Sequence, residues 1–563
     1  MIVIDRRNFL AHAAALPVAG AAKSNATTRS AENREFAALI DAERDAIRTT
    51  MAADAIGAAS ICFVHRNQPV WVEGFGKAGS AADRPAEPDT LFSIQSTSKS
   101  FAAVAVLLAV QDGLLDLDAP ITRYIPDFTV NSRFEAAPQE RMTLRLLLAN
   151  RAGFTHEAPV GNNYDPAAPS FEAHVRSISD TWLRFPVGDR YRYSNLGYDL
   201  AGHIVERTAG IRYADWLQHR IFEPLGMRSS TADPAIYTVD ANRAAGTHKG
   251  YDAVPRVSPL VVSGGVWTSA RDMAAYAAFL AARGRWQDRQ LLAPELWAEM
   301  HGFALGGDYG LGVMRSERRY GKTPVRLLHH RGGGFGFGCN FVYCPQAELG
   351  WAALFNRPAL AGYRFGMDLL DKVLEQRFGP RAPRLPVAAL APIQPTTDRV
   401  RALLGHYVGR NVSGTVGETG GKLHFRKDGH EIDEPLELTA PDELFAVNPE
   451  GETVTYRYHA AGAALPAHLE CSEGEASLDY NGGPDDAFGP DREEWQRYLG
   501  HYRVRQWGKA AIDVVIARRH GYLELNGIRL VDETEPGLFF TSDGEAVDFR
   551  GAATWRNLIL EAA

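Results

Sequence analysis

The chain has few cysteines, and their spacing is not that of a metal site. Only four occur in 563 residues: Cys62, Cys339, Cys344 and Cys471. They form no Cys-x-x-Cys pair and show no cysteine–histidine spacing typical of zinc. A Cys339–Cys344 disulfide stays open as an alternative, although strand residues five apart usually point to opposite faces. We therefore expect no metal, no other cofactor, and a fold that does not depend on disulfides.

An excess of positive charge and a long apolar run are also lacking. The net charge is −8, with 45% hydrophobic and 23% charged residues, as in an average soluble protein. This composition offers no basic field to nucleic acid or anionic lipid. The apolar stretch that ends near residue 22 is about 14 residues long, whereas a membrane-spanning helix needs ~20. We expect no nucleic-acid partner and no transmembrane segment. The sequence does not indicate an oligomeric state.

The first 22 residues resemble a twin-arginine export signal. Arg6-Arg7 is followed by Phe9-Leu10 and a short, alanine-rich apolar stretch, and residues 19–21 form a plausible cleavage site. The alternative is an amphipathic or disordered start of a cytoplasmic protein. The signal predicts a periplasmic location.

Three domains and a linker are expected from the length and the change of pattern along the chain. Helical and strand patterns alternate across residues 30–379, five prolines follow within residues 380–396, and strand patterns dominate residues 397–490 and 491–563. Leu-Gly-His-Tyr occurs at residues 404–407 and again at 499–502, each time before alternating strands. We interpret this as a faint internal repeat of two all-β units, for which chance remains an alternative.

Within the first domain, residues 36–51 predict an amphipathic helix and residues 57–75 a hairpin. Residues 98–113 predict a helix that is apolar on so wide a face that it should be buried at the centre of the domain.

Ser96 and Lys99 stand at the start of this buried helix. Residues three apart share a helix face, with about 5–6 Å between Cβ atoms, so the lysine amine can approach the serine hydroxyl. A serine needs a neighbouring base to become a good nucleophile, and a desolvated lysine can act as one. Taken alone, Ser-x-x-Lys is weak evidence, because most such tetrapeptides are solvated helix turns.

Two further segments change that interpretation. Tyr193-Ser194-Asn195 lies in a turn before a helix, and His330-Arg331-Gly332 lies where a strand should begin a glycine-rich stretch that continues through Gly334. An ordinary turn and a flexible loop are the alternatives. Residues 334–338 lack the spacing and the following helix of a dinucleotide site.

In this order the three segments resemble the class C β-lactamase, D,D-peptidase and esterase branch of the penicillin-recognising serine hydrolases. The resemblance covers about residues 36–375. It includes residues 111–120, 124–126, 143–148, 224–227, 264–272 and 309–312. One departure is Asn-Arg-Ala-Gly at residues 150–153, where the family usually has His-Thr-Ser-Gly.

The resemblance implies an α+β catalytic domain, in which helices flank an antiparallel sheet beside a helical subdomain. The two C-terminal units resemble the lipocalin-like or small-barrel appendages of D-aminopeptidase-type relatives.

The resemblance also implies the catalytic roles. Ser96 would be the nucleophile, Lys99 its base or proton relay, and Tyr193 the other half of the acid–base pair. Asn195 would bind a substrate amide and orient Lys99. His330 takes the place of the family's lysine in Lys-Thr-Gly, and it would donate to Tyr193 or to a substrate carboxylate with a charge that depends on pH.

The remaining predicted site residues would act through their backbone. The N–H groups of Ser96 and Gly333 would form the oxyanion hole. Gly332 and Gly334 would let the substrate approach the strand closely.

The resemblance leaves several activities open: peptidase or amidase, carboxylesterase, and β-lactamase. The missing lysine of the third motif argues mildly against a dedicated β-lactamase. We favour a peptidase or amidase that acts on small or unusual peptides, containing D-amino acids or arising from linearised cyclic peptides. A non-catalytic protein that binds cell-wall peptides is the alternative from another class, and it should have lost Ser96, Lys99 or Tyr193.

Overall fold

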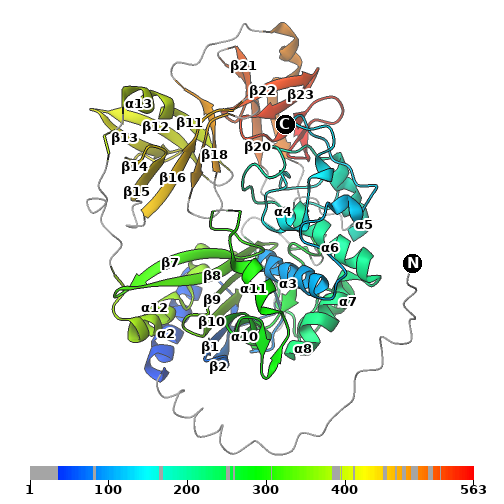
Figure 1. Ribbon diagram of the computed structural model, residues 1–563, viewed down its shortest axis with the longest axis vertical. Helices are drawn as coiled ribbons and strands as arrows, with labels where there is room; N and C mark the ends of the chain where they lie inside the picture. The colour runs from blue at the N-terminus through cyan, green and yellow to red at the C-terminus, as the bar shows by residue number, and fades with distance from the viewer. Residues whose placement is uncertain are drawn as a thin grey trace, which may run out of the picture.

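Figure 1 shows the computed structural model of the chain. The predicted signal and most of the predicted linker lie outside the described residues. The structure describes residues 36–79, 84–163, 169–248, 254–255, 257, 260–305, 307–382, 393–394, 396–409, 412–447, 453–462, 466–471, 477–483, 492–504, 512–519 and 521–563.

A six-stranded antiparallel sheet forms the centre of the catalytic domain. Its first two strands are the predicted hairpin, which pairs with strands nearly 300 residues later in the chain. In sheet order the strands are β2 (Gln68–Gly76), β1 (Ala58–His65), β10 (Leu349–Phe355), β9 (Phe337–Cys344), β8 (Thr323–Gly334) and β7 (Met314–Tyr320).

The sheet separates two hydrophobic cores. On one face, alternate residues such as Ile61, Phe63 and Trp351 pack against α2 (Ala37–Ala53) and α12 (Met367–Phe378). On the other face, Cys62, Val64 and their equivalents on the neighbouring strands belong to the core of α3 (Ser98–Gln111) and α10 (Ala270–Ala281). Because side chains of a strand alternate between faces, a strand buried on both faces is apolar along nearly its whole length. All eight residues of β1 are buried.

Helix α3 lies inside the domain, as predicted, with twelve of its fourteen residues buried. It packs against α6 (Leu196–Ala209), which begins directly after Asn195. The shorter helices of this part are α4 (Leu144–Leu148), α5 (Phe171–Ser177), α7 (Tyr213–Leu217), α8 (Glu223–Leu225), α9 (Pro234–Tyr237) and α11 (Pro294–His301). Two short strand pairs complete it, β3 (Phe92–Ser93) with β4 (Trp267–Thr268) and β5 (Arg285–Trp286) with β6 (Arg289–Gln290).

The two C-terminal units are closed eight-stranded antiparallel barrels, which Figure 1 draws in yellow and orange-red. The first barrel consists of β11 (Gly405–Val408), β12 (Ser413–Thr419), β13 (Lys422–Lys427), β14 (Asp433–Ala440), β15 (Glu443–Val447), β16 (Thr453–His459), β17 (His468–Cys471) and β18 (Ser477–Gly482). The second consists of β19 (Gly500–Val504), β20 (Asp513–Arg519), β21 (Tyr522–Leu525), β22 (Ile528–Glu535), β23 (Leu538–Thr541), β24 (Ala546–Asp548), β25 (Thr554–Trp555) and β26 (Leu558–Ala562).

The Leu-Gly-His-Tyr repeat occupies equivalent places in the two barrels. Each copy starts the first strand of its barrel directly after a short helix, α13 (Thr397–Leu403) or the 3₁₀ helix Glu493–Tyr498. In each copy the tyrosine hydroxyl donates to the carbonyl four residues earlier, at 2.9 Å: Tyr407 to Leu403 and Tyr502 to Tyr498. The shared contact supports the interpretation of residues 404–407 and 499–502 as a repeat.

Two local features differ from the sequence-based expectations. Helix α13 begins a region in which strand patterns dominate, and Thr396 caps it by accepting from the backbone N–H of Arg399. Strand β8 begins seven residues before His330 instead of at it. All four cysteines are free thiols, and Cys339 and Cys344 lie on the single strand β9.

Candidate active site

A strained turn presents Ser96 at the start of α3. Ser96 lies in the 3₁₀ turn Gln95–Thr97, which leads directly into the helix. The preceding residue, Gln95, has φ +49°, in the left-handed region that non-glycine residues rarely adopt. Its side-chain amide donates to the Ser93 hydroxyl at 2.7 Å. Strain of this kind persists only where the surroundings impose it, which is common at functional sites.

The ammonium group of Lys99 is the charged centre of the site. Its side chain is completely buried. The Nζ atom lies 3.2 Å from Ser96 Oγ, 2.8 Å from Asn195 Oδ1 and 3.0 Å from the carbonyl oxygen of Ser263. The structure therefore brings together Ser96, Lys99 and Asn195, as predicted, and adds the Ser263 carbonyl.

The Ser263 carbonyl is held in place by Asp199, which the sequence analysis missed. The buried Asp199 carboxylate accepts from the backbone N–H groups of Val262 and Ser263 and from the Ser263 hydroxyl, at 2.9–3.1 Å. His174 Nε2 lies 3.3 Å from it, and this partner raises the pKa of His174 although burial opposes the rise. A carboxylate one helical turn after Asn195, among the buried residues that begin α6, was the available signal.

Tyr193 lies directly over Lys99. The Lys99 Nζ atom is 4.7 Å from the centre of the Tyr193 ring, and the tyrosine is only 5% exposed. The His156 ring lies nearly parallel to the Tyr193 ring, with 6.0 Å between centroids, and its Nδ1 is 2.6 Å from the carboxylate of buried Glu157. His156 and Glu157 are neighbours of the site that no motif indicated.

His330 is placed beside Tyr193 but does not donate to it. Its Nδ1 is 2.7 Å from the Arg331 carbonyl oxygen, so this nitrogen carries the proton, and Nε2 accepts from the Tyr309 hydroxyl at 3.1 Å. Burial and the charge of Lys99 lower the pKa of His330 to about 3. In this structure His330 thus bonds the Arg331 carbonyl and Tyr309 instead of Tyr193, and burial beside an ammonium group favours the neutral imidazole at pH 7.

The glycines of β8 allow the strand to touch the turn that holds Ser96. A Cβ atom on Gly332 would lie 1.9 Å from the Ile94 carbonyl oxygen and 3.1 Å from the Ser96 backbone nitrogen. On Gly333 it would meet the Tyr363 hydroxyl at 2.4 Å, and Gly334 has φ +146°. Gly332 and Gly334 thus lie against the turn that holds Ser96, and Gly333 lies against Tyr363.

Comparison with known proteins agrees with this geometry. The profile of the Beta-lactamase family, described as Beta-lactamase, matches residues 44–375. The chain belongs to this family. Its β-lactamase-like fold is therefore established, and the chain is a serine-type hydrolase, as its relatives are.

Several curated proteins are similar to this chain. A human (Homo sapiens) protein described as beta-lactamase-like 1 is 25% identical over 406 residues, covering 69% of this chain and 78% of that protein. Esterase EstB of Burkholderia gladioli is 31% identical over 234 residues, covering 39% of this chain and 58% of the esterase. Unguisins hydrolase ungD' of Aspergillus campestris is 26% identical over 339 residues, covering 54% and 60%.

Among solved structures, SurE matches with a TM-score of 0.55 and 24% identity, covering 78% of this chain and 99% of SurE. This likeness supports the fold. In the described part of the chain, no helix has the length and apolar character needed to cross a membrane. The same residues contain no group of three or more His, Cys, Asp or Glu side chains that could hold a metal ion.

The contact between Gly332 and Ile94 generates a first prediction. Gly332→Ala should slow covalent labelling of Ser96 by a fluorophosphonate probe about 10²-fold or more, because the added methyl forces the strand away from the nucleophile turn. Gly551→Ala is the matched control, since no atom lies within 4 Å of a Cβ placed there. A folded Gly332→Ala protein that labels at the wild-type rate would contradict the predicted close approach.

A second prediction concerns the protonation of His330. Its imidazole NMR signal, assigned by its loss in His330→Gln, should not titrate between pH 8 and 5, because its folded pKa is about 3. The unfolded chain, with a histidine pKa of about 6.5, binds the extra proton below that pH. His330 therefore makes the free energy of unfolding fall as the pH drops from about 6.5 toward 3, and His330→Gln should weaken this dependence. A midpoint near pH 6.5 in the folded protein would contradict the prediction.

Proposed function

We propose that this serine hydrolase is a peptidase or amidase for small or unusual peptides, those with D-amino acids or derived from linearised cyclic peptides, and that it forms an acyl-enzyme on Ser96. The observation that carries the proposal is the position of Lys99 Nζ, 3.2 Å from Ser96 Oγ and 4.7 Å from the ring centre of Tyr193. A nucleophile, a base and a second proton-transfer group thus meet in one buried place.

In the acylation half of the reaction, Ser96 Oγ attacks the substrate carbonyl carbon. The serine proton passes to Tyr193 in its phenolate form, whose negative charge the Lys99 ammonium group stabilises, and the carbonyl oxygen becomes an oxyanion. The N–H groups of Ser96 and Gly333 stabilise this oxyanion, an effect worth about 10²–10³ in rate per donor. When the intermediate collapses, the C–N bond breaks and the departing amine receives the proton.

In the deacylation half, water gives up a proton to the Tyr193 phenolate, which was regenerated when the amine took the proton, and attacks the acyl carbon. The C–O bond to Ser96 breaks, the serine regains its proton, and the carboxylic acid product leaves. Asn195 Oδ1, bound to Lys99 at 2.8 Å, keeps the ammonium group in place through both halves. The three residues that a non-catalytic binding protein should have lost are all present and in contact, which argues against that alternative.

The choice of an amide substrate rests on the leaving group. An amine leaves only when it is protonated, whereas an alkoxide leaves more readily, so an amidase depends more strongly on a general acid at the nucleophile. Tyr193 and Lys99 supply such a group. Neutral His330 offers no fixed positive charge to a substrate carboxylate, which argues against a dedicated β-lactamase. Carboxylesterase activity is the second candidate, because the esterase of Burkholderia gladioli is 31% identical over the matched region.

Matched amide and ester substrates with the same acyl group provide the test. Tyr193→Phe should lower kcat/KM for the amide about 10²–10⁴-fold and for the ester clearly less, because only the amine needs protonation to leave. Tyr124→Phe serves as a control in the same domain; its hydroxyl accepts a hydrogen bond from the Asp116 backbone.

A mass-spectrometric screen of D- and L-peptides, linearised cyclic peptides and p-nitrophenyl esters identifies the preferred substrate. Failure of wild type to label with a fluorophosphonate, or equal labelling of Ser96→Ala, would overturn the acyl-enzyme proposal. A higher kcat/KM for the ester than for its matched amide, with no added loss for the amide in Tyr193→Phe, would favour the esterase.

We also propose that residues 1–22 direct export to the periplasm by the twin-arginine route. The pair Arg6-Arg7 before a short apolar stretch supports this. Replacing both arginines by lysine should retain the full chain in the cytoplasm, as cell fractionation and immunoblotting would show. Unchanged export of this variant would refute the proposal.

A further inference from the structure

Three buried arginines lie in the segment that leads to Tyr193. Arg184, Arg190 and Arg192 are only 4%, 7% and 4% exposed. Burial and the neighbouring Arg184 lower the pKa of Arg192, which reflects the cost of placing several cations together away from water. A cluster of this kind persists only if carboxylates compensate it.

The carboxylates come from both C-terminal barrels. Asp479 on β18 of the first barrel pairs with Arg190, at 2.8 Å, and with Arg192. Asp543 and Glu545, in the turn between β23 and β24 of the second barrel, pair with Arg184 at 2.9 and 3.2 Å. The Asp543 backbone carbonyl accepts two further hydrogen bonds from Arg184, at 2.7 and 3.0 Å.

All three carboxylates are themselves buried, with at most 5% of the side chain exposed. The charges of Arg184 and Arg556 lower the pKa of Asp543 although burial opposes this. The three acids are therefore buried partners of the arginines and not solvent-facing groups that lie nearby by chance.

A second connection, made of hydrogen bonds, joins the turn between β23 and β24 to Ser194, the neighbour of Tyr193. Thr155 Oγ1 donates to Glu545 Oε2 at 2.5 Å, and the Thr155 carbonyl accepts from Ser194 Oγ at 2.6 Å. Ser194 stands between Tyr193 and Asn195. The side chain of Asn557, also in the second barrel, donates to the Glu157 carbonyl at 2.8 Å, next to the histidine that stacks on Tyr193.

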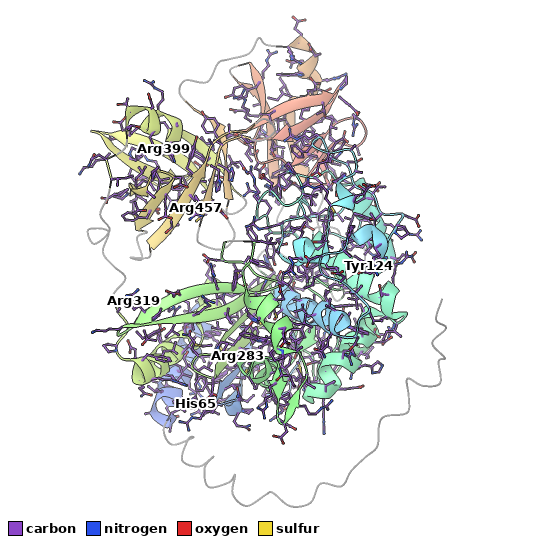
Figure 2. All side chains as sticks on the ribbon, in the orientation of Figure 1. His65, Tyr124, Arg283, Arg319, Arg399 and Arg457 are labelled. Carbon is purple, nitrogen blue, oxygen red and sulfur yellow. The ribbon has the colours of Figure 1, made fainter. Side chains whose placement is uncertain are left out.

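The two barrels are also joined to each other by hydrogen bonds. Asn481 Oδ1 on β18 accepts from the Arg529 backbone N–H and from the Ser542 hydroxyl of the second barrel, both at 2.7 Å. Ser542 belongs to the turn that carries Asp543 and Glu545. Figure 1 shows this barrel against the cyan helical region, and Figure 2 shows side chains filling their junction.

We propose that Asp479, Asp543 and Glu545 are positioning residues for Tyr193, so that both barrels are needed to place the acid–base pair of the hydrolase. The proposal rests on the function proposed above for Ser96 and Tyr193. Both barrels compensate the arginines that precede Tyr193, and the second barrel, through Thr155, holds Ser194, which follows it. They thus act on the rate of acylation as well as covering the helical region.

Glu545→Gln and Thr155→Val test the route through Ser194 in the full-length protein. Both should slow labelling of Ser96 by a fluorophosphonate about 10- to 100-fold, because displacing a reacting group by about 1 Å costs that much. For a turned-over substrate the loss should fall on kcat with little change in KM, and the pH–rate profile should shift. Thr155→Ser, which keeps the hydroxyl, should restore the wild-type rate and profile.

Asp548→Asn is the matched control. Asp548 lies on β24, but its partner at 2.8 Å is Arg550 of the same barrel and not a residue of the catalytic domain. This variant should leave both the rate and the profile unchanged. Thr155→Val removes one hydroxyl without changing side-chain size. If Glu545→Gln does not fold, Thr155→Val alone tests the positioning role.

The outcomes separate the two proposals. Wild type that does not label at Ser96 overturns the proposed function. Wild type that labels, together with Thr155→Val or a folded Glu545→Gln that labels at the same rate and with the same pH profile, overturns the positioning role and leaves the proposed function standing. A Thr155→Ser variant as slow as Thr155→Val also overturns it, since the hydroxyl would then not be the cause.

Discussion

A fully buried lysine ammonium group is the constraint on which the site depends. An isolated charge inside a protein is so costly that it must be hydrogen-bonded on several sides. Lys99 meets this requirement through Ser96, Asn195 and the Ser263 carbonyl. Because the Ser263 carbonyl is fixed by Asp199, one cation links α3, α6 and the loop after residue 260. Burial and the same charge lower the pKa of His330, which makes its imidazole neutral.

Charge compensation also connects the catalytic domain to its barrels. Arg184, Arg190 and Arg192 are too deeply buried to be solvated, and Asp479, Asp543 and Glu545 neutralise them from two different domains. Pairs of this kind contribute little net stability, yet removing one partner leaves a costly unpaired charge. The interface is thus sensitive to its exact partners. This favours a view of the barrels as part of the support of the site, beyond a role in selecting substrates.

Periodicity was sufficient for most of the fold. The wide apolar face of residues 98–113 predicted the central helix, and alternation predicted the hairpin and two all-β units, which are closed barrels. Periodicity failed where a local contact decided the outcome. The seven-residue helix α13 depends on a cap at Thr396, and β8 extends before His330 because its residues 323–329 pair with β7. The domain boundaries and the export signal stay predictions.

The sequence by itself determined which groups can do chemistry. Ser96 and Lys99 are three residues apart, so any helix there brings them together, and the order of the Tyr193 and His330 segments indicated the family. Tertiary structure alone decided the state of those groups. The neutrality of His330, the contact of Asp199 with the Ser263 loop, and the pairing of Arg184 with acids about 360 residues later all depend on burial and on long-range proximity. Local residue spacing indicates neither burial nor long-range proximity, because desolvation and pairing arise only when distant segments pack together.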